Sequence, residues 1–434
     1  MSAVEVVSYP SDPVAPKIEA ILNRKLGVSD DVDLIVRQIL EAIRLDGDRA
    51  VGKFSAQFDG VGVTDSGYRV PVSELKSAIH GLDSGLRVAI EKAKENVYSF
   101  HSHQTGKSWF VEDGDGVILG KKYTPIDRIG VCVPGGKAPL FSSLIMCAVP
   151  AQIAGVKEIC VVSPPQKGGG VDPIIAATAY LLGIDEVHAV GGAQAVGAMA
   201  YGTESIRRVD KIVGPGSPYT VAAQKQVFGI VGIPMLPGPS EIVVLADDGA
   251  ESSYVAADML SQAEHGWGVA SVCITTSAKL AEELNVELAR QLAELPDRGD
   301  VVRALEEFGA IVIVDNLDDG IELLNLLAPE HAELLIANPW DSLYKIKHCG
   351  AIFLGSHSTE PVGDYFAGTN HVLPTNGAAR YASSLGVGDF IKDTSVIAYS
   401  EKRIEKTGAM ISRLARAEGL EAHARAVEIR GETS

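Results

Sequence analysis

The spacing of apolar side chains divides the chain into helical ends and a middle of alternating strands and helices. Apolar residues recur at three- and four-residue intervals over residues 31–58 and 73–101, which predicts amphipathic helices. From residue 128 onward, short β-branched runs alternate with glycine turns and helical stretches. This alternation predicts parallel strands joined by crossover helices, so the expected fold class is α/β. Residues 401–430 return to the helical pattern.

The predicted strands carry the sequences RIGVCVP, EICVVSP, EVHAV, KIVGPG, EIVVLAD, VCITTS, AIVIVD and GAIFLG. A stretch from about residue 130 to 239 is rich in Gly, Ala and Pro and poor in charge, which suggests an inserted lobe. We therefore predict two incomplete doubly wound, Rossmann-like parallel-sheet lobes with helical N- and C-terminal segments. The predicted divisions are an N-terminal arm (1–29), a discontinuous first lobe (30–129 and 240–385), an inserted lobe with cofactor-contacting glycine loops (130–239) and a C-terminal helical dimerisation segment (386–434).

Composition narrows the class of protein. The 434 residues include 56 acidic and 38 basic side chains, so the formal net charge is −18. Such a charge opposes binding to nucleic acid or to anionic lipid, and it favours a small-molecule enzyme. The first 25 residues lack the apolar core of a secretory signal, and the uncharged stretch 138–156 holds polar groups that lipid would leave unpaired. The five cysteines form no C-x-x-C pair, which favours reduced thiols and a cytoplasmic location.

Two short motifs pair histidine with a carboxylate or an amide. In SQAEHG, at the expected end of a helix, Gln262 and His265 lie three residues apart; imidazole is a common zinc ligand and an amide oxygen is a rare one. In APEHAE, the proline before Glu330 and His331 suggests the first turn of a helix. Glu330 could activate water and His331 could move a proton. Alternatively, Glu330 could stabilise the helix N-terminus and His331 could be a surface residue.

Two further stretches carry polar density. The loop GDYFAGTNH crowds Asp364, a possible hard ligand, and His371, a possible substrate contact, into nine positions. The C-terminal helix brings Glu418 and His423 within one and a half turns, which alone is typical of a solvated helix face.

Three glycine turns follow predicted strands: PGG at 134–136, GGAQ at 191–194 and GPGSP at 214–218. Backbone N–H groups in such turns can approach a phosphate or a nucleotide closely. No G-x-G-x-x-G occurs in the required strand-to-helix context, so these turns alone leave dinucleotide binding open.

Taken together and in order, these pieces resemble the histidinol dehydrogenase family. The similarity runs from about residue 30 to 430 and rests on ten collinear strings: RIGVCVPGGKAPL, SSLIMCAVPAQIAGVKEICVVSPP, VGGAQAVGAMAYGTESI, VDKIVGPG, PGPSEIVVLAD, LSQAEHG, APEHAEL, GAIFLG, GDYFAGTNHVLPT and AEGLEAHARAV. The resemblance implies oxidation of L-histidinol to L-histidine in two successive NAD-dependent steps, through an enzyme-bound aldehyde, with one zinc ion per active site. The implied process is histidine biosynthesis.

The resemblance also implies roles for individual residues. The zinc ligands fall on Gln262, His265, Asp364 and His423, and His423 would come from the partner subunit of a homodimer. The acid/base pair falls on Glu330 and His331. Substrate contacts fall on these six residues together with Ser240, His371 and Glu418.

The implied cofactor contacts fall on Cys132, Gln194 and Ser217. The family usually has Tyr at the first of these positions and Asn at the last, so two side chains are smaller here; Leu236 and Phe141 also depart from the usual Ala and Tyr. Three alternatives remain: a paralogous zinc- and NAD-dependent dehydrogenase of another small polar alcohol, a zinc hydrolase, and a silent binding protein.

Overall fold

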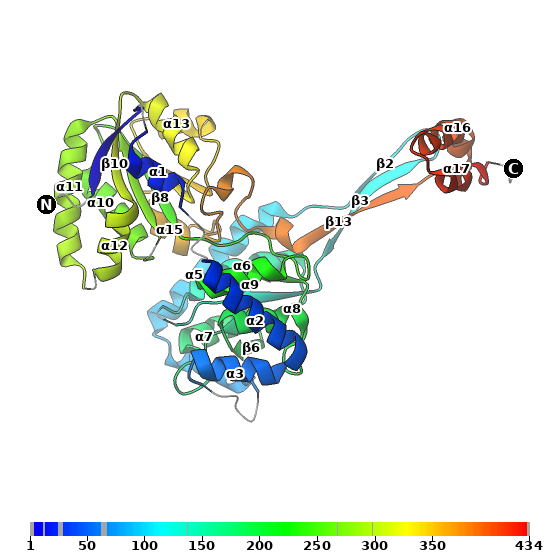
Figure 1. The fold of residues 1–434 in the computed structure, drawn as a ribbon, viewed down its shortest axis with the longest axis horizontal. Helices are drawn as coiled ribbons and strands as arrows, with labels where there is room; N and C mark the ends of the chain where they lie inside the picture. The colour runs from blue at the N-terminus through cyan, green and yellow to red at the C-terminus, as the bar shows by residue number, and fades with distance from the viewer. Residues whose placement is uncertain are drawn as a thin grey trace.

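The computed structural model describes residues 4–11, 14–24, 29–61, 67–136, 138–266, 268–296 and 298–431. Figure 1 shows two α/β lobes and an arm that projects far from both and carries two helices at its tip. Within the described residues, no helix combines the length and apolar character needed to cross a membrane. All five cysteines are described and none forms a disulfide, as expected for reduced thiols. The cytoplasmic location itself stays a prediction.

The larger lobe is built on a six-stranded parallel sheet with strand order β1-β10-β9-β8-β11-β12. Strands β8 and β9 are buried along their whole length, which explains their unbroken β-branched sequences. The strands are β1 (Glu5–Tyr9), β8 (Glu241–Ala246), β9 (Ala270–Thr275), β10 (Gly309–Val314), β11 (His331–Leu335) and β12 (Ala351–Leu354).

Helices cover both faces of this sheet. One apolar cluster joins the strands to α10, α11 and α12, and another joins them to α1 and α13. The helices of this lobe are α1 (Pro16–Leu22), α10 (Ser252–Ala263), α11 (Ala278–Glu294), α12 (Gly299–Phe308), α13 (Leu317–Leu327), α14 (Pro339–Ser342) and α15 (Glu360–Tyr365). The lobe is therefore doubly wound, as predicted.

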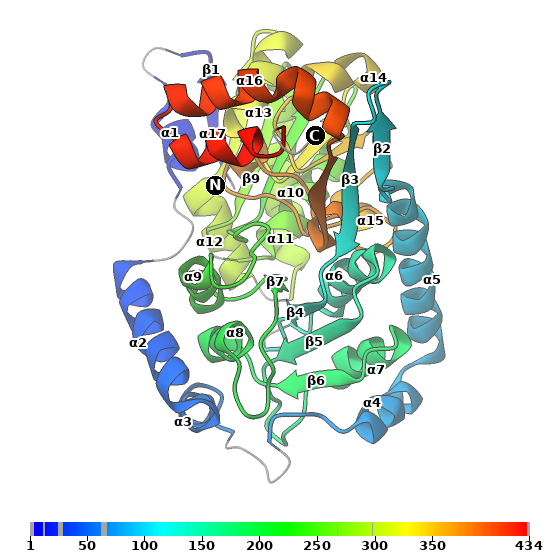
Figure 2. The ribbon, with the colours of Figure 1, turned by 90° about the vertical axis from the view of Figure 1, so that its right-hand side faces the viewer.

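The smaller lobe has a four-stranded parallel sheet with strand order β6-β5-β4-β7. Figure 2 shows α2, α3, α8 and α9 on one side of it and α4 to α7 on the other. The strands are β4 (Arg128–Cys132), β5 (Glu158–Ser163), β6 (Glu186–Ala189) and β7 (Lys211–Val213). The helices are α2 (Asp30–Asp46), α3 (Asp48–Phe58), α4 (Val72–Ala78), α5 (Ser84–His101), α6 (Phe141–Ala154), α7 (Pro173–Leu181), α8 (Gly192–Tyr201) and α9 (Pro218–Val227).

The helical region before residue 102 packs on this smaller sheet. Val36, Ile39 and Ile43 of α2 join a buried cluster with α8, and Ile90 and Val97 of α5 join one with α6. The predicted grouping of residues 30–129 with 240–385 differs from this packing, because the apolar stripes of these helices find their partners on the smaller lobe. The helical prediction for residues 31–58 and 73–101 is confirmed, with a break at Gly47, where φ is +53°.

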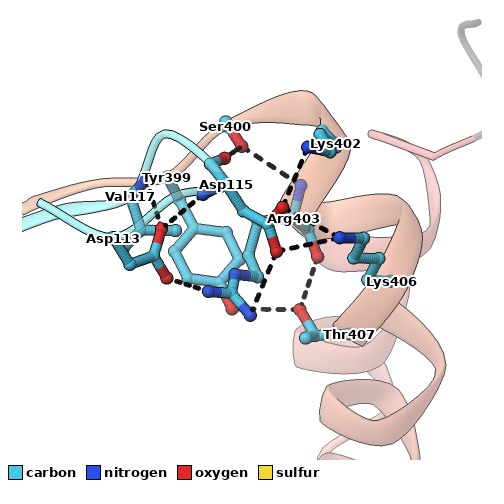
Figure 3. Close-up of polar contacts among 9 residues, drawn as sticks. All are labelled: Asp113, Asp115, Val117, Tyr399, Ser400, Lys402, Arg403, Lys406 and Thr407. Carbon is cyan, nitrogen blue, oxygen red and sulfur yellow. Dashed lines mark hydrogen bonds and ion pairs between the residues drawn. The ribbon is translucent and has the colours of Figure 1, made fainter.

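The arm is a three-stranded antiparallel sheet of order β13-β3-β2, with α16 and α17 at its end. Its elements are β2 (Trp109–Glu112), β3 (Ile118–Pro125), β13 (Ile391–Ala398), α16 (Glu401–Ala417) and α17 (Glu421–Glu428). Figure 3 shows how the helices are fixed to the strands: Asp113 and Asp115 of the β2–β3 turn bind Lys402, Arg403 and Lys406 of α16. Short 3₁₀ helices elsewhere are η1 (Ile79–Gly81), η2 (Ser102–Gln104), η3 (Leu343–Lys345), η4 (Ala378–Arg380) and η5 (Val387–Phe390).

All eight strands predicted from β-branched runs are present, but two local predictions are wrong. The helix expected at Pro329–His331 is instead the start of strand β11, since His331 pairs with both β8 and β12. The stretch from Gly363 to His371 is not a loop throughout, because Asp364 lies in the short helix α15. Helix α10 ends at Ala263, so Gln262 is helical and His265 lies just beyond the helix.

Candidate active site

The predicted catalytic residues gather where β8 and β11 begin, on the side of the larger lobe that meets α6 of the smaller one. His331 begins β11 and Glu330 directly precedes it, and α10 and α15 supply Gln262 and Asp364 beside them. His371 links the two lobes, because its Nε2 lies 3.2 Å from Ser143 Oγ of α6 and its Nδ1 lies 2.8 Å from the Asp364 carbonyl oxygen. The pairing of β8 with β11 brings Glu330 to Glu241, 89 positions away, and the contact of His371 with Ser143 joins residues 228 positions apart.

The buried imidazole of His331 is held with one nitrogen free. Its Nδ1 lies 3.0 Å from both the Glu241 carbonyl oxygen and the Gln262 Oε1 atom, so Nδ1 carries the proton and donates to them. Its Nε2 makes no hydrogen bond with any described residue and lies 3.8 Å from Asp364 Oδ1. Burial lowers the pKa of His331 to about 4, although the negative charge of Asp364 acts to raise it. The ring is therefore neutral near pH 7 and presents a free lone pair, as a proton acceptor requires.

Glu330 is a buried carboxyl group with its own fixed surroundings. Its Oε2 accepts the backbone N–H of Glu241 at 3.3 Å, and the Ser240 hydroxyl also bonds to it. Burial raises the pKa of Glu330 well above its usual value, and the charges of Glu241 and Asp364 raise it further. A carboxylate in such surroundings is a stronger base than one in water, which suits it to activating a water molecule.

Three of the predicted metal-site residues, Gln262, His265 and Asp364, lie close together and form, with Glu360, the metal-site cluster. The imidazole of His265 is 43% exposed, and its ligand atom lies within 4.8 Å of those of Glu360 and Asp364. Gln262 is fully buried, and its Nε2 makes no hydrogen bond with any described residue. Nitrogen and oxygen donors gathered in this way fit a zinc ion. Glu360, whose Oε1 lies 3.8 Å from His265 Nε2, was not predicted from the sequence.

Further carboxyl groups adjoin the metal-site cluster. Glu333 Oε1 accepts the backbone N–H of Glu360 at 2.8 Å, and the Glu360 side chain accepts the Ser261 hydroxyl at 3.3 Å. Burial and the charge of Asp258 raise the pKa of Glu333 to about 10. Burial and the charge of Asp364 raise the pKa of Glu360 to about 8. These like charges disfavour ionisation of one another, and a bound cation would relieve that repulsion.

Glu333→Gln should raise the thermal unfolding midpoint of metal-free protein at pH 8 and leave it nearly unchanged at pH 4.5. Folded Glu333, with a pKa of about 10, stays protonated where the unfolded side chain ionises, near pH 4.5. The folded state therefore binds the extra proton between these values, and stability falls as pH rises through that window. Glutamine has no proton to lose, so calorimetry at pH 8 should show a rise of at least about 2 °C.

The matched control for this test is Glu294→Gln, which removes an exposed carboxylate of α11. Its midpoint should change alike at both pH values. Equal midpoints for Glu333→Gln and the unmodified chain at pH 8 would show that folding does not hold a proton on Glu333.

The two C-terminal residues of the predicted set lie elsewhere in this chain. Glu418 ends α16 and His423 lies on α17, and both are exposed at the tip of the arm, far from α10 and α15 in Figure 1. A single chain thus brings Gln262, His265 and Asp364 together and leaves His423 apart from them.

The predicted cofactor residues line one groove over the carboxyl ends of the smaller sheet. A cavity of about 200 Å³ is bounded by Cys132, the PGG turn, Gly191, Gly192 and Ser217. It continues, through the shared Pro164, Gly192 and Ser217, into a second cavity of about 300 Å³ lined by Gln194, Asp59, Phe58 and Tyr219. Gln194 Nε2 donates to Asp59 Oδ2 at 3.1 Å. Asp59 follows α3 in an ordinary polar sequence, so its place here could not be inferred from the sequence.

Comparison with known proteins agrees with this arrangement. Residues 22–431 match the family model described as histidinol dehydrogenase. A histidinol dehydrogenase of Halalkalibacterium halodurans is 48% identical over 410 residues, which cover 94% of this chain and 96% of the relative. One from Listeria monocytogenes is 45% identical over 416 residues, with 96% of each chain covered. The crystal structure of histidinol dehydrogenase from Elizabethkingia anophelis superposes with a TM-score of 0.93 at 36% identity, covering 100% of this chain and 99% of that one.

Proposed function

Because this chain belongs to the histidinol dehydrogenase family and is a dehydrogenase, we propose that it oxidises L-histidinol to L-histidine in histidine biosynthesis. The reaction would proceed through a bound aldehyde, with two NAD molecules and one zinc ion per site. The observation that carries this proposal is the placement of a free-nitrogen His331 and a buried Glu330 directly beside Gln262, His265 and Asp364.

Gln262, His265 and Asp364, with His423 of the partner subunit, would hold the zinc. The support is chemical: an accessible imidazole and a carboxylate come within 4.8 Å of each other, beside a buried amide. Bound zinc would supply a fixed anchor for the amino and imidazole nitrogens of the substrate, and so orient its alcohol carbon. His371 and Ser240 would contact the substrate, as would Glu418 of the partner subunit.

His331 would accept the alcohol proton in the first oxidation. Its Nδ1–H donates to the Glu241 carbonyl and to Gln262, which fixes the tautomer and points Nε2 at the site. Since burial keeps its pKa near 4, the ring is free to take a proton at any pH near neutrality.

Glu330 would deprotonate the water that attacks the aldehyde in the second half of the reaction. The raised pKa of Glu330 makes its ionised form an effective base, and aldehyde oxidation should therefore reach its full rate at a higher pH than an ordinary carboxyl group would require. The two neighbours thus have separate tasks, one with the alcohol proton and one with water.

NAD would lie along the groove of the smaller lobe and supply the hydride acceptor. The end at the PGG turn is nearer α6 and the catalytic residues, so the adenosine half would reach the cavity of Phe58, Asp59 and Tyr219. A carboxylate there can accept a ribose hydroxyl and repels a 2′-phosphate, which favours NAD over NADP. Cys132 and Ser217 leave more room in the groove than the usual tyrosine and asparagine.

A homodimer would complete the site. The arm exposes large apolar side chains that a partner could cover: Trp109, Phe110, Met410, Leu414 and Ile429. A two-fold exchange of arms would carry Glu418 and His423 to the partner's metal-site cluster, and the second arm would do the same in return.

NADH released per L-histidinol consumed should be close to two. Each half-reaction removes one hydride, so complete conversion to the acid reduces two NAD molecules. The measurement is NADH absorbance against chromatographic loss of substrate, in the presence of added zinc. A paralogue acting on another small polar alcohol would show little turnover or a very high KM with L-histidinol, and a zinc hydrolase would form product without NADH.

A further inference from the structure

A buried ion pair lies directly behind Glu330 and reaches it from the far N-terminal part of the chain. Arg24, just after α1, pairs through Nη2 with Glu241 Oε1, across 217 positions of sequence. Both side chains are only 5% exposed. The guanidinium also lies over the Phe308 ring, 5.6 Å from its centroid, so its place is set from two sides. Removing one member of a pair this deep in the lobe would leave the charge of the other uncompensated.

Glu241 uses its carboxylate to hold the backbone around the site. Its Oε2 accepts the N–H of Glu330 at 3.1 Å, and its Oε1 accepts the N–H of Asn376 at 2.6 Å as well as the arginine. In return the Glu241 N–H donates to Glu330 Oε2 at 3.3 Å. The two residues lie side by side where the parallel strands β8 and β11 begin. Each carboxylate therefore accepts the backbone N–H of the other residue.

Glu241 reaches the second catalytic residue too, because its carbonyl oxygen lies 3.0 Å from His331 Nδ1. Two carboxyl groups so close together in the interior repel each other when ionised, and Arg24 supplies the positive charge that holds Glu241 in place. Without Arg24, the negative charge of Glu241 would have no positive partner, and the hydrogen bonds between Glu241 and Glu330 would be weakened.

We propose that Arg24 and Glu241 are positioning residues for Glu330, with Arg24 acting through Glu241 to keep the carboxylate aimed at the water of the second half-reaction. This inference rests on the proposed function, in which Glu330 activates that water. The N-terminal segment that carries Arg24 would therefore contribute to catalysis, a role that its sequence pattern does not indicate.

The surroundings of Arg24 allow a sharp test by chemical rescue. A cavity of about 300 Å³, lined by Arg24, Glu241, Asn376, Arg380 and nearby apolar residues, adjoins the guanidinium and extends to the exposed Arg380. The Nε and Nη1 atoms of Arg24 make no hydrogen bond with any described residue. Arg24→Ala should therefore join the vacated space to this cavity, and free guanidinium ion from solution should be able to enter it.

The experiment measures stopped-flow NADH formation by the zinc-loaded dimer with L-histidinaldehyde and, separately, with L-histidinol. Arg24→Ala should slow aldehyde oxidation by about 10²-fold, the loss typical of a misplaced catalytic group, and slow alcohol oxidation much less. Millimolar guanidinium chloride should restore most of the aldehyde rate. Urea, which has the same shape without the charge, should not. Arg24→Lys keeps the positive charge but not the planar guanidinium group. Its rate of aldehyde oxidation should lie between those of Arg24→Ala and the unmodified chain.

Arg380→Ala is the matched control, because Arg380 lines the same cavity but donates to the Leu326 carbonyl and not to Glu241. It should keep both rates. If Arg24→Ala does not fold, Arg24→Lys and Glu241→Gln test the inference instead. Each should slow oxidation of L-histidinaldehyde more than oxidation of L-histidinol. Equal losses on both substrates without guanidinium rescue, or unchanged rates with only a lower unfolding temperature, would overturn the inference. Failure of the proposed function is distinguishable, since the unmodified chain would then not oxidise the aldehyde at all.

Discussion

Replacing His265 or His423 with alanine should abolish NADH formation from L-histidinol and bound zinc together. His265 is the accessible imidazole beside Asp364 and Glu360, and His423 is exposed on α17 at the tip of the arm. If both histidines bind one zinc ion, either change removes a ligand and leaves the site with too few donors to hold the metal. Zinc content by atomic absorption and the steady-state rate should therefore fall in parallel.

A mixture of the two inactive variants should regain activity if His423 comes from the partner subunit. In a hybrid dimer, one site loses both histidines while the other keeps both, so half of the sites in each hybrid are intact. Equal mixing with free exchange makes half of the dimers hybrid, and the recovered rate should approach about a quarter of the unmodified rate. Mass spectrometry of a differently tagged pair confirms that exchange has taken place.

The mixing experiment separates two arrangements that look alike in any single variant. No recovery after proven exchange would mean that each chain builds its site from its own arm, and the proposed arm exchange would be wrong. Full zinc and full rate in His423→Ala would remove this histidine from the metal site altogether. The control is Arg425→Ala, which changes an exposed neighbour on the same helix and should keep zinc and rate.

Sequence reading succeeded where burial leaves a strong pattern. Parallel strands buried on both faces, such as Glu241–Ala246, read as continuous β-branched runs and were predicted correctly. The strands of the arm were missed, since Trp109–Glu112 is exposed throughout and has no buried face to create a pattern. Strand β11 was mistaken for a helix start because its buried positions include His331 and Glu333, polar side chains placed there by the chemistry of the site.

The candidate site divides in the same way. The sequence predicts Gln262 with His265 and Glu330 with His331 as candidates, because each pair lies in a short motif, and the fold brings the two motifs to one place. It does not predict contacts between segments that are distant in the chain. Arg24 meets Glu241 only because α1 packs on the sheet that contains β8, and Asp59 meets Gln194 only because α3 packs beside α8. No local spacing encodes such pairs.

Glu330→Gln should slow oxidation of L-histidinaldehyde by roughly 10²–10⁴-fold, the range typical of losing a general base, and slow oxidation of L-histidinol much less. Glutamine keeps an oxygen that can accept the Glu241 N–H and the Ser240 hydroxyl, so the local structure should survive. It cannot take a proton from water, which only the second half-reaction requires. The measurement is stopped-flow NADH formation with each substrate in turn. With L-histidinol, only the first NADH formed per active site is counted, because the second comes from oxidation of the aldehyde.

His331→Asn provides the contrasting variant, because in the proposed mechanism the alcohol step uses the free Nε2 of His331 and involves no water. It should slow alcohol oxidation strongly, so the two variants should fail on different substrates. The pH dependence gives a second readout: aldehyde oxidation should rise with pH over the raised titration range of Glu330, and this rise should disappear in Glu330→Gln. Equal losses on both substrates, with the rise intact, would show that this carboxyl group serves the electrostatics of the site, and the base that activates water would have to be sought among its neighbours, with Glu360 as the first candidate.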